Sequence, residues 1–330
     1  MPPASSLSAL ETPYLTPRGA EPARITLGTM NFGKRTSAAD SARIIDRAVE
    51  RGVTLFDTAN MYAEGESERI VGRAIAARRG NIVLATKVGY GRVAGKTEGL
   101  SRTTITRAIE ESLGRLATDY IDVYYLHGPD ATTPIEETID AMAEQIAKGR
   151  VRHFGVSNFA SWQILEIIRL CDERGLERPL ISEVMYNLLI RQVEVEYLRF
   201  ARKYPIHTTV YNPLAGGLLT DRYQAGDSVA AGSRFDKNKL YQKRYWNERM
   251  LELVQSYRAL AAEAQMTVVE LAYAWLAGAP GVDSILVGPG SVEHLDAALD
   301  AVGKSVSPEL REKARAIHEA FTGTDASYAR

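Results

Sequence analysis

Apolar residues along this chain alternate between short β-branched runs and longer segments with helical spacing. The short runs predict strands buried on both faces, at 25–30, 54–58, 82–88, 121–126, 151–156, 180–185, 206–211 and 284–287. Helices are predicted between and after them, at 37–51, 67–78, 101–116, 134–149, 162–174, 192–203, from about 247, at 291–302 and at 308–321. Strands that alternate with helices in this way predict a parallel α/β fold.

The evenness of these units favours a (β/α)8 TIM barrel over a doubly wound sheet. A doubly wound dinucleotide-binding sheet would carry a Gly-x-Gly-x-x-Gly turn after its first strand, and residues 28–33 lack that pattern. Residues 220–243 show no clear periodicity and predict a long irregular loop after strand 7, which is usually functional. We therefore expect one barrel domain over 24–330, with extra C-terminal helices, preceded by a flexible tail over 1–23.

Composition narrows the class of protein. The chain has 330 residues, of which 45% are hydrophobic and 25% charged, and its net charge is −1. That balance gives no electrostatic reason to bind nucleic acid or an anionic membrane. No apolar run approaches the roughly 18 residues that span a bilayer, and the tail lacks the pattern of a signal peptide. With Cys171 as the only cysteine, an internal disulfide is excluded and a reducing, cytoplasmic location is expected.

Three ionisable residues stand where apolar strands end. Asp57, Lys87 and His127 each end such a run, and Tyr62 follows Asp57 on a polar loop. In a barrel of parallel strands the carboxyl ends meet on one rim, where active sites are built. Because a buried carboxylate requires a partner, we expect Lys87 to pair with Asp57.

This group of residues suits proton transfer. A phenol has a pKa near 10, and a neighbouring ammonium lowers that value by stabilising the phenolate. We therefore expect Lys87, held by Asp57, to tune Tyr62 as a general acid, with His127 orienting a substrate oxygen. Such an acid fits hydride delivery to a carbonyl, whose oxygen must gain a proton. The remaining histidines are scattered, so no metal site is expected.

From about residue 25 to its C-terminus, the chain resembles the aldo-keto reductases. The resemblance is carried by Phe-Asp-Thr-Ala at 56–59 with Tyr62, Ala-Thr-Lys at 85–87, Leu-His at 126–127, Gly-Val-Ser-Asn at 155–158 and Leu-Val-Gly at 286–288. Residues 125–130, 185–187 with 191–194, and 212–220 resemble the aflatoxin-aldehyde reductase subgroup more narrowly. The resemblance implies that Tyr62 donates the proton, that Asp57 and Lys87 tune it, and that His127 positions the carbonyl.

The resemblance also implies NADPH as cofactor. Ser157 and Asn158 would bind the nicotinamide carboxamide, Tyr211 would stack on the ring, and residues 214–219 would cradle the pyrophosphate with backbone N–H groups. Residues 288–298 would meet the adenosine 2′-phosphate at a helix N-terminus. The complete expected set is Ser157, Asn158, Glu183, Tyr211, Pro213, Leu214, Gly216, Leu218, Gly288, Ser291 and His294.

Three positions depart from the family pattern. Glu183 stands where Gln is common, His294 where Arg, Lys or Gln is usual, and Ala298 where Asn usually contacts adenine. The last two changes keep NADH as an alternative cofactor.

The substrate pocket has fewer sequence markers. Arg234 resembles a subgroup arginine that grips substrate carboxylates, and Arg330 is a second candidate. Met61 and Trp246 are expected to wall the pocket. The alternatives are a solvated surface position for each arginine and a core position for the aromatic ring.

Three functions remain open at this stage. The leading one is an enzyme that reduces an aldehyde or ketone, with a small-molecule carbonyl substrate, no nucleic-acid or membrane partner, and a homodimeric state implied by the subgroup. The second is a nicotinamide-sensing accessory subunit, like the channel-associated β subunits that share this fold. The third is a lyase or hydrolase that uses Lys87 as a Schiff base, in which Tyr62 and Asp57 have no obvious task.

Overall fold

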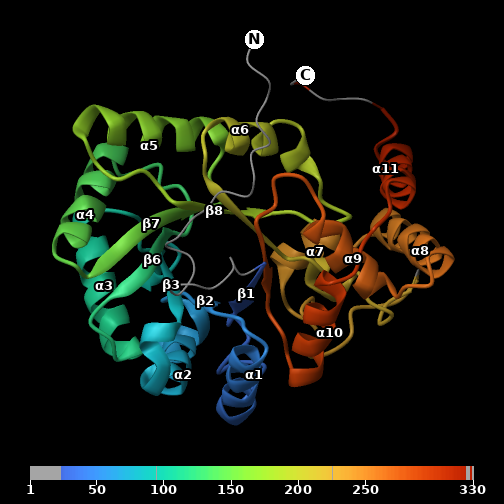
Figure 1. Cartoon of the computed structure of the whole chain (residues 1–330), viewed down its shortest axis with the longest axis horizontal. Coiled ribbons are helices and arrows are strands. Elements are labelled where there is room, and N and C mark those ends of the chain that lie inside the picture. The colour runs from blue at the N-terminus through green and yellow to red at the C-terminus, as the bar shows by residue number, and fades with distance from the viewer. Residues whose placement is uncertain (1–23, 94, 225, 325–327, 329–330) are drawn as a thin grey trace.

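The computed structural model of the chain describes residues 24–93, 95–224, 226–324 and 328, so the predicted tail over 1–23 and Arg330 lie outside it. Within those residues eight parallel strands close into a barrel (Figure 1). They are β1 (Ile25–Gly28), β2 (Leu55–Asp57), β3 (Val83–Val88), β6 (Ile121–Leu126), β7 (Val151–Ser157), β8 (Ile181–Met185), β9 (His207–Tyr211) and β10 (Ser284–Val287). The predicted (β/α)8 barrel is confirmed, and the doubly wound sheet is excluded.

Helices surround the barrel on its outer side (Figure 1). They are α1 (Ala38–Glu50), α2 (Glu66–Ile75), α3 (Arg102–Leu116), α4 (Ile135–Ala147), α5 (Ser161–Arg174), α6 (Tyr197–Lys203), α7 (Lys239–Tyr245), α8 (Glu248–Glu263), α9 (Val268–Ala277), α10 (Val292–Val302) and α11 (Pro308–Thr322). The expected extra C-terminal helix is α11, which packs on α8 and accepts a hydrogen bond from the Tyr257 hydroxyl at the Ala314 carbonyl, 3.3 Å away. None of the helices in the described ranges is both long and apolar enough to cross a bilayer.

Two segments differ from the prediction. The loop expected over 220–243 ends earlier, because α7 begins at Lys239, where the Asn238 side chain accepts a hydrogen bond from the Tyr241 N–H. Its few apolar residues left no helical period to detect over so short a helix. The glycine-rich loop after β3 contains a hairpin of β4 (Arg92–Val93) and β5 (Lys96–Thr97), whose exposed residues have no hydrophobic pattern.

The alternation of side chains along the strands builds the interior of the barrel. An inner cluster, separate from the main core, is formed by Leu55, Val83, Ala85, Val123, Tyr125 and Ile181. Since successive strand residues point to opposite faces, the residue two positions further along β2, β3 and β8 also points inward. Those residues are Asp57, Lys87 and Glu183, so one strand period places three charged side chains above an apolar floor.

Packing of α2 on α3 generates a stability prediction. A Cβ added at Gly72 of α2 would lie 2.4 Å from the Leu116 carbonyl oxygen, whereas one added at Gly114 of α3 meets nothing within 4 Å. We expect Gly72→Ala to destabilise the protein by about 1–3 kcal/mol, because backbone blocks the added methyl group. Gly114→Ala is expected to stabilise it by about 0.5–1 kcal/mol through helix propensity. Urea unfolding of both variants measures this, and equal effects would contradict the close packing.

Candidate active site

The centre of the site is a buried ammonium between two carboxylates. Lys87 Nζ donates to Asp57 Oδ2 and, at 3.3 Å, to the Thr58 carbonyl oxygen, and it lies 3.4 Å from Glu183 Oε1. The side chains of Lys87, Asp57 and Glu183 are 1%, 1% and 3% exposed. The predicted contact between Asp57 and Lys87 is present, and Glu183 is an additional neighbour that the sequence did not place there.

Burial and charge act together on these groups. Burial raises the pKa of Asp57, the charge of Glu183 raises it further, and Lys87 lowers it only in part, so the pKa stays well above its ordinary value. Burial lowers the pKa of Lys87, but Asp57 and Glu183 outweigh burial and hold it above its ordinary value. Lys87 therefore keeps its charge at neutral pH.

Tyr62 begins a 3₁₀ turn, Tyr62–Gly65, directly above this cluster. Its ring lies 5.8 Å from Lys87 Nζ and meets the His127 ring edge to face, with centroids 5.9 Å apart. Burial raises the pKa of Tyr62 above its ordinary value, although Lys87 lowers it as predicted. The expectation of a net lowered pKa is wrong for this state, because loss of solvent outweighs the ammonium. The phenol is therefore protonated, as a proton donor must be.

His127 is a neutral ring in the same pocket. Burial lowers its pKa well below the ordinary value, and Lys87 lowers it further. Its buried Nδ1 has no hydrogen-bond partner among the described residues. The Tyr90 ring packs on it with centroids 4.9 Å apart, and a Cβ added at Gly128 would lie 1.9 Å from the Tyr90 hydroxyl, so a larger residue there would displace Tyr90. The sequence analysis missed Tyr90, whose only signal was an aromatic residue between Gly89 and Gly91.

Four of the residues expected to bind the nicotinamide form one network. Ser157 Oγ donates to Glu183 Oε2 over 3.4 Å, and Asn158 Nδ2 donates to Ser157 Oγ over 3.0 Å and to the His127 carbonyl oxygen over 2.9 Å. The Tyr211 hydroxyl donates to Asn158 Oδ1 over 2.6 Å. Asn158 adopts a φ of 64°, in the left-handed region that asparagine tolerates. The structure therefore brings Ser157, Asn158, Glu183 and Tyr211 together next to Lys87.

The loop after β9 holds four further residues of the expected set: Pro213, Leu214, Gly216 and Leu218. Its backbone N–H groups bond within the loop, from Gly216 to Asn212 Oδ1 at 2.9 Å, and from Gly217 to the Leu214 carbonyl oxygen at 2.8 Å. Those donors are therefore occupied in this state. A pyrophosphate would have to replace these local bonds.

The remaining residues of the expected set lie at the end of β10. The Gly288 carbonyl accepts from Asn31 Nδ2 at 3.2 Å. Ser291 caps α10 by accepting from the His294 N–H at 3.3 Å, and the His294 side chain is exposed. The imidazole of His294 is therefore exposed in the first turn of α10.

Arg234 reaches the rim from the loop after β9. Its Nη2 donates to Asn31 Oδ1 at 2.9 Å, and its guanidinium lies 5.6 Å from the Tyr241 ring centroid. Among the described residues no carboxylate forms an ion pair with Arg234. Burial of the guanidinium lowers the pKa of Arg234 below its ordinary value. An arginine that is partly buried and lacks a counter-charge suits an anionic ligand.

The two residues expected to wall the pocket differ in their surroundings. Met61 is 42% exposed beside Tyr62, so its side chain is free to contact a ligand. Trp246 packs among aromatic rings, 4.9 Å from the Phe235 centroid and 5.0 Å from that of Tyr223. Its aromatic contacts are therefore with Tyr223 and Phe235 of the segment that follows β9.

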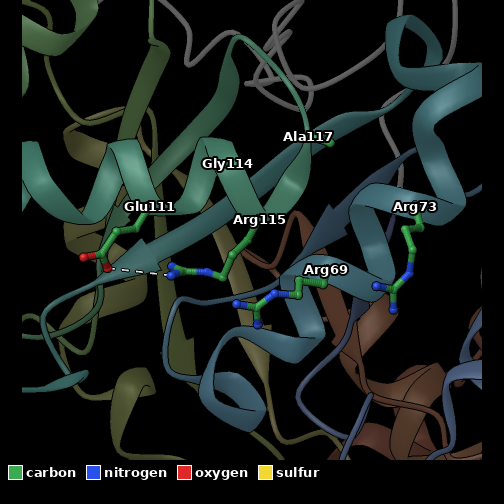
Figure 2. Close-up of a pocket in the computed structure, with 6 residues that line it drawn as sticks. All are labelled: Arg69, Arg73, Glu111, Gly114, Arg115 and Ala117. Atoms are coloured by element: carbon green, nitrogen blue, oxygen red, sulfur yellow. Dashed lines mark ion pairs between the residues drawn. The ribbon is translucent and has the colours of Figure 1, made fainter.

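A hollow on the outer wall, between α2 and α3, is not part of this site. Figure 2 shows Arg69, Arg73 and Arg115 around it, with Arg115 paired to Glu111. Arg115 also reaches the buried Glu68 at 2.5 Å, which accepts from the Thr86 hydroxyl at 2.6 Å. This arginine therefore anchors α3 to the strand that carries Lys87. In the described part of the chain no group of histidine, cysteine and carboxylate residues could hold a metal ion.

Comparison with known proteins agrees with this geometry. A sequence model described as "Aldo/keto reductase family" matches residues 24–318. The chain belongs to the aldo/keto reductase family. The family consists of oxidoreductases that use nicotinamide cofactors, and the resemblance drawn from the strand-end motifs is confirmed.

Relatives of the family carry two kinds of name. The human "Aflatoxin B1 aldehyde reductase member 2" is 36% identical over 293 residues, which cover 83% of this chain and 80% of the relative. The human "Aldo-keto reductase family 7 member A3" is 35% identical over 297 residues, covering 86% and 89%. A "Probable voltage-gated potassium channel subunit beta" of Arabidopsis thaliana is 35% identical over 279 residues, covering 83% and 85%.

The buried charges generate a prediction for Lys87→Met, which keeps the length of the side chain. Two buried carboxylates would then lack their counter-charge, so we expect a loss of about 3–5 kcal/mol in the free energy of unfolding at pH 7. The loss should shrink as the pH falls and Asp57, whose pKa is raised, takes up a proton, and adding Asp57→Asn should recover part of it. Urea unfolding at several pH values measures this; a small loss that does not depend on pH would contradict it.

Proposed function

We propose that this aldo/keto reductase reduces an aldehyde or ketone to an alcohol with NADPH. The observation that carries the proposal is the protonated Tyr62 phenol, placed over a charged Lys87 and against a neutral His127. When bound, the cofactor supplies a hydride to the carbonyl carbon. Tyr62 supplies the proton that the carbonyl oxygen needs, so the product is a neutral alcohol.

Each neighbour of Tyr62 has a role that follows from its charge. Lys87 stabilises the phenolate that remains after proton transfer, and Asp57 holds the ammonium in place. His127, being neutral, can donate a hydrogen bond to the carbonyl oxygen without adding a charge. After each turnover Tyr62 regains a proton from solvent.

The cofactor fits the network that surrounds these residues. In this proposal Ser157, Asn158 and Glu183 hold the carboxamide, and Tyr211 meets the ring. Pro213, Leu214, Gly216 and Leu218 take the pyrophosphate, and Gly288, Ser291 and His294 take the adenosine end. Because an imidazole stands where a permanent cation is usual, NADH is the alternative cofactor.

The test is Tyr62→Phe, which removes only the hydroxyl. We expect turnover of NADPH with small aldehydes to fall by about 10²- to 10⁴-fold, while the dissociation constant for NADPH is unchanged. Tyr120→Phe is the matched control. Tyr120 lies between Arg79 and Arg152 just before β6, at the opposite end of the strand from the proposed site. Full activity in Tyr62→Phe would overturn the mechanism.

A second candidate function is a nicotinamide-binding accessory subunit with little turnover. The relative named as a potassium channel subunit beta favours it. The same assay separates the two functions, because an accessory subunit would bind NADPH tightly and reduce none of the aldehydes. We also infer a homodimer, supported by the resemblance to the aflatoxin-aldehyde reductases, and a cytoplasmic location, supported by the single cysteine, Cys171. Analytical ultracentrifugation tests the oligomeric state.

Arg234 adds a prediction about the substrate. It has no carboxylate partner among the described residues, so we propose that it binds an acidic group of the substrate. Arg234→Gln should raise KM for succinic semialdehyde by about 10- to 100-fold, the worth of a charge-assisted hydrogen bond. KM for butanal, which lacks the carboxylate, should not change. Arg73→Gln is the control, since Arg73 is exposed on the outer wall, where it pairs with Glu66 at 3.1 Å. Equal changes for both aldehydes would contradict the role.

A further inference from the structure

Two acidic side chains lie against Lys87, the one cation of this cluster. Asp57 and Glu183 are both buried against one ammonium, and Lys87 hydrogen bonds to Asp57. Asp57 Oδ1 and Glu183 Oε1 have no hydrogen-bond partner among the described residues. Because His127 and Tyr62 are neutral, Lys87 is the one cation of this cluster that faces these two acidic side chains.

Glu183 also belongs to the network that faces the proposed nicotinamide position. It accepts from Ser157 Oγ at 3.4 Å, and its carbonyl oxygen accepts from the Asn158 N–H at 3.1 Å. The Glu183 side chain therefore joins the Lys87 cluster to Ser157, while the backbone of Glu183 holds Asn158. A glutamine at this position could make the same contacts without a charge.

The two forms of a nicotinamide cofactor differ in charge at the ring. The oxidised ring carries one positive charge and the reduced ring carries none, while the rest of the molecule is the same. A buried carboxylate beside the ring site attracts only the charged form, and in a protein interior such attraction is only weakly screened.

We propose that Glu183 makes this site prefer the oxidised cofactor over the reduced one, and so favours hydride transfer from cofactor to carbonyl on the protein. This inference rests on the proposed function, because it requires a nicotinamide ring next to Ser157 and Asn158. Glu183 acts through its charge and is a specificity-determining residue for the redox state of the cofactor. The ring gains its positive charge as it gives its hydride to the carbonyl, and the Glu183 carboxylate favours that charged product.

The experiment compares the dissociation constants of NADP+ and NADPH by isothermal titration calorimetry, without substrate. The dissociation constant of NADP+ divided by that of NADPH isolates the effect of the ring charge, because both forms make the same contacts at the adenosine end. We expect Glu183→Gln to raise this ratio by about tenfold or more, as expected for the loss of one nearby charge. Glu183→Met, which is neutral and cannot accept a hydrogen bond, should raise it similarly.

Glu183→Asp is the matched control, since it disturbs the packing but keeps the charge. Its ratio should stay within about threefold of the wild type. An unchanged ratio in both neutral variants, or an equal rise in Glu183→Asp, would overturn the role of the charge. Wild-type protein that binds neither form of the cofactor would instead overturn the proposed function, and this inference with it.

Discussion

The site depends on one constraint: a lysine ammonium that has been removed from water must be neutralised by carboxylates that other strands of the barrel supply. Lys87 meets Asp57 from β2 and Glu183 from β8, which lie on different sides of the barrel. The closure of the sheet is what makes both contacts available to one side chain. In return, the charged cluster defines the electrostatic surroundings of Tyr62 and His127 at the top of the barrel.

This arrangement joins stability to chemistry. Desolvation raises the pKa of Tyr62 and lowers that of His127, so both are neutral and the phenol holds its proton. Lys87 opposes the first of these shifts, which means that it stabilises the phenolate once the proton has left. A single buried cation can therefore leave the resting acid protonated and still ease its ionisation during reaction.

The outer wall supports the same strands. Thr86, the neighbour of Lys87, points away from the barrel interior and donates to Glu68 of α2, which Arg115 of α3 also holds. Alternation along β3 thus sends one residue to the chemistry and the next to the helices that fix its position. The long segment after β9 completes the rim, since Arg234 reaches Asn31 on the loop after β1.

The sequence by itself determined the architecture and the central residues, because short apolar runs, helical spacing between them and polar residues at strand ends are local patterns. Asp57, Tyr62, Lys87 and His127 could be selected in this way before any contact was known. Only the tertiary structure decided that Glu183 lies beside Lys87, since the two are neighbours across the barrel and far apart in the chain. It also decided that the pKa of Tyr62 is raised, because desolvation depends on packing from every side, and it placed Tyr90 on His127 through a loop without periodicity.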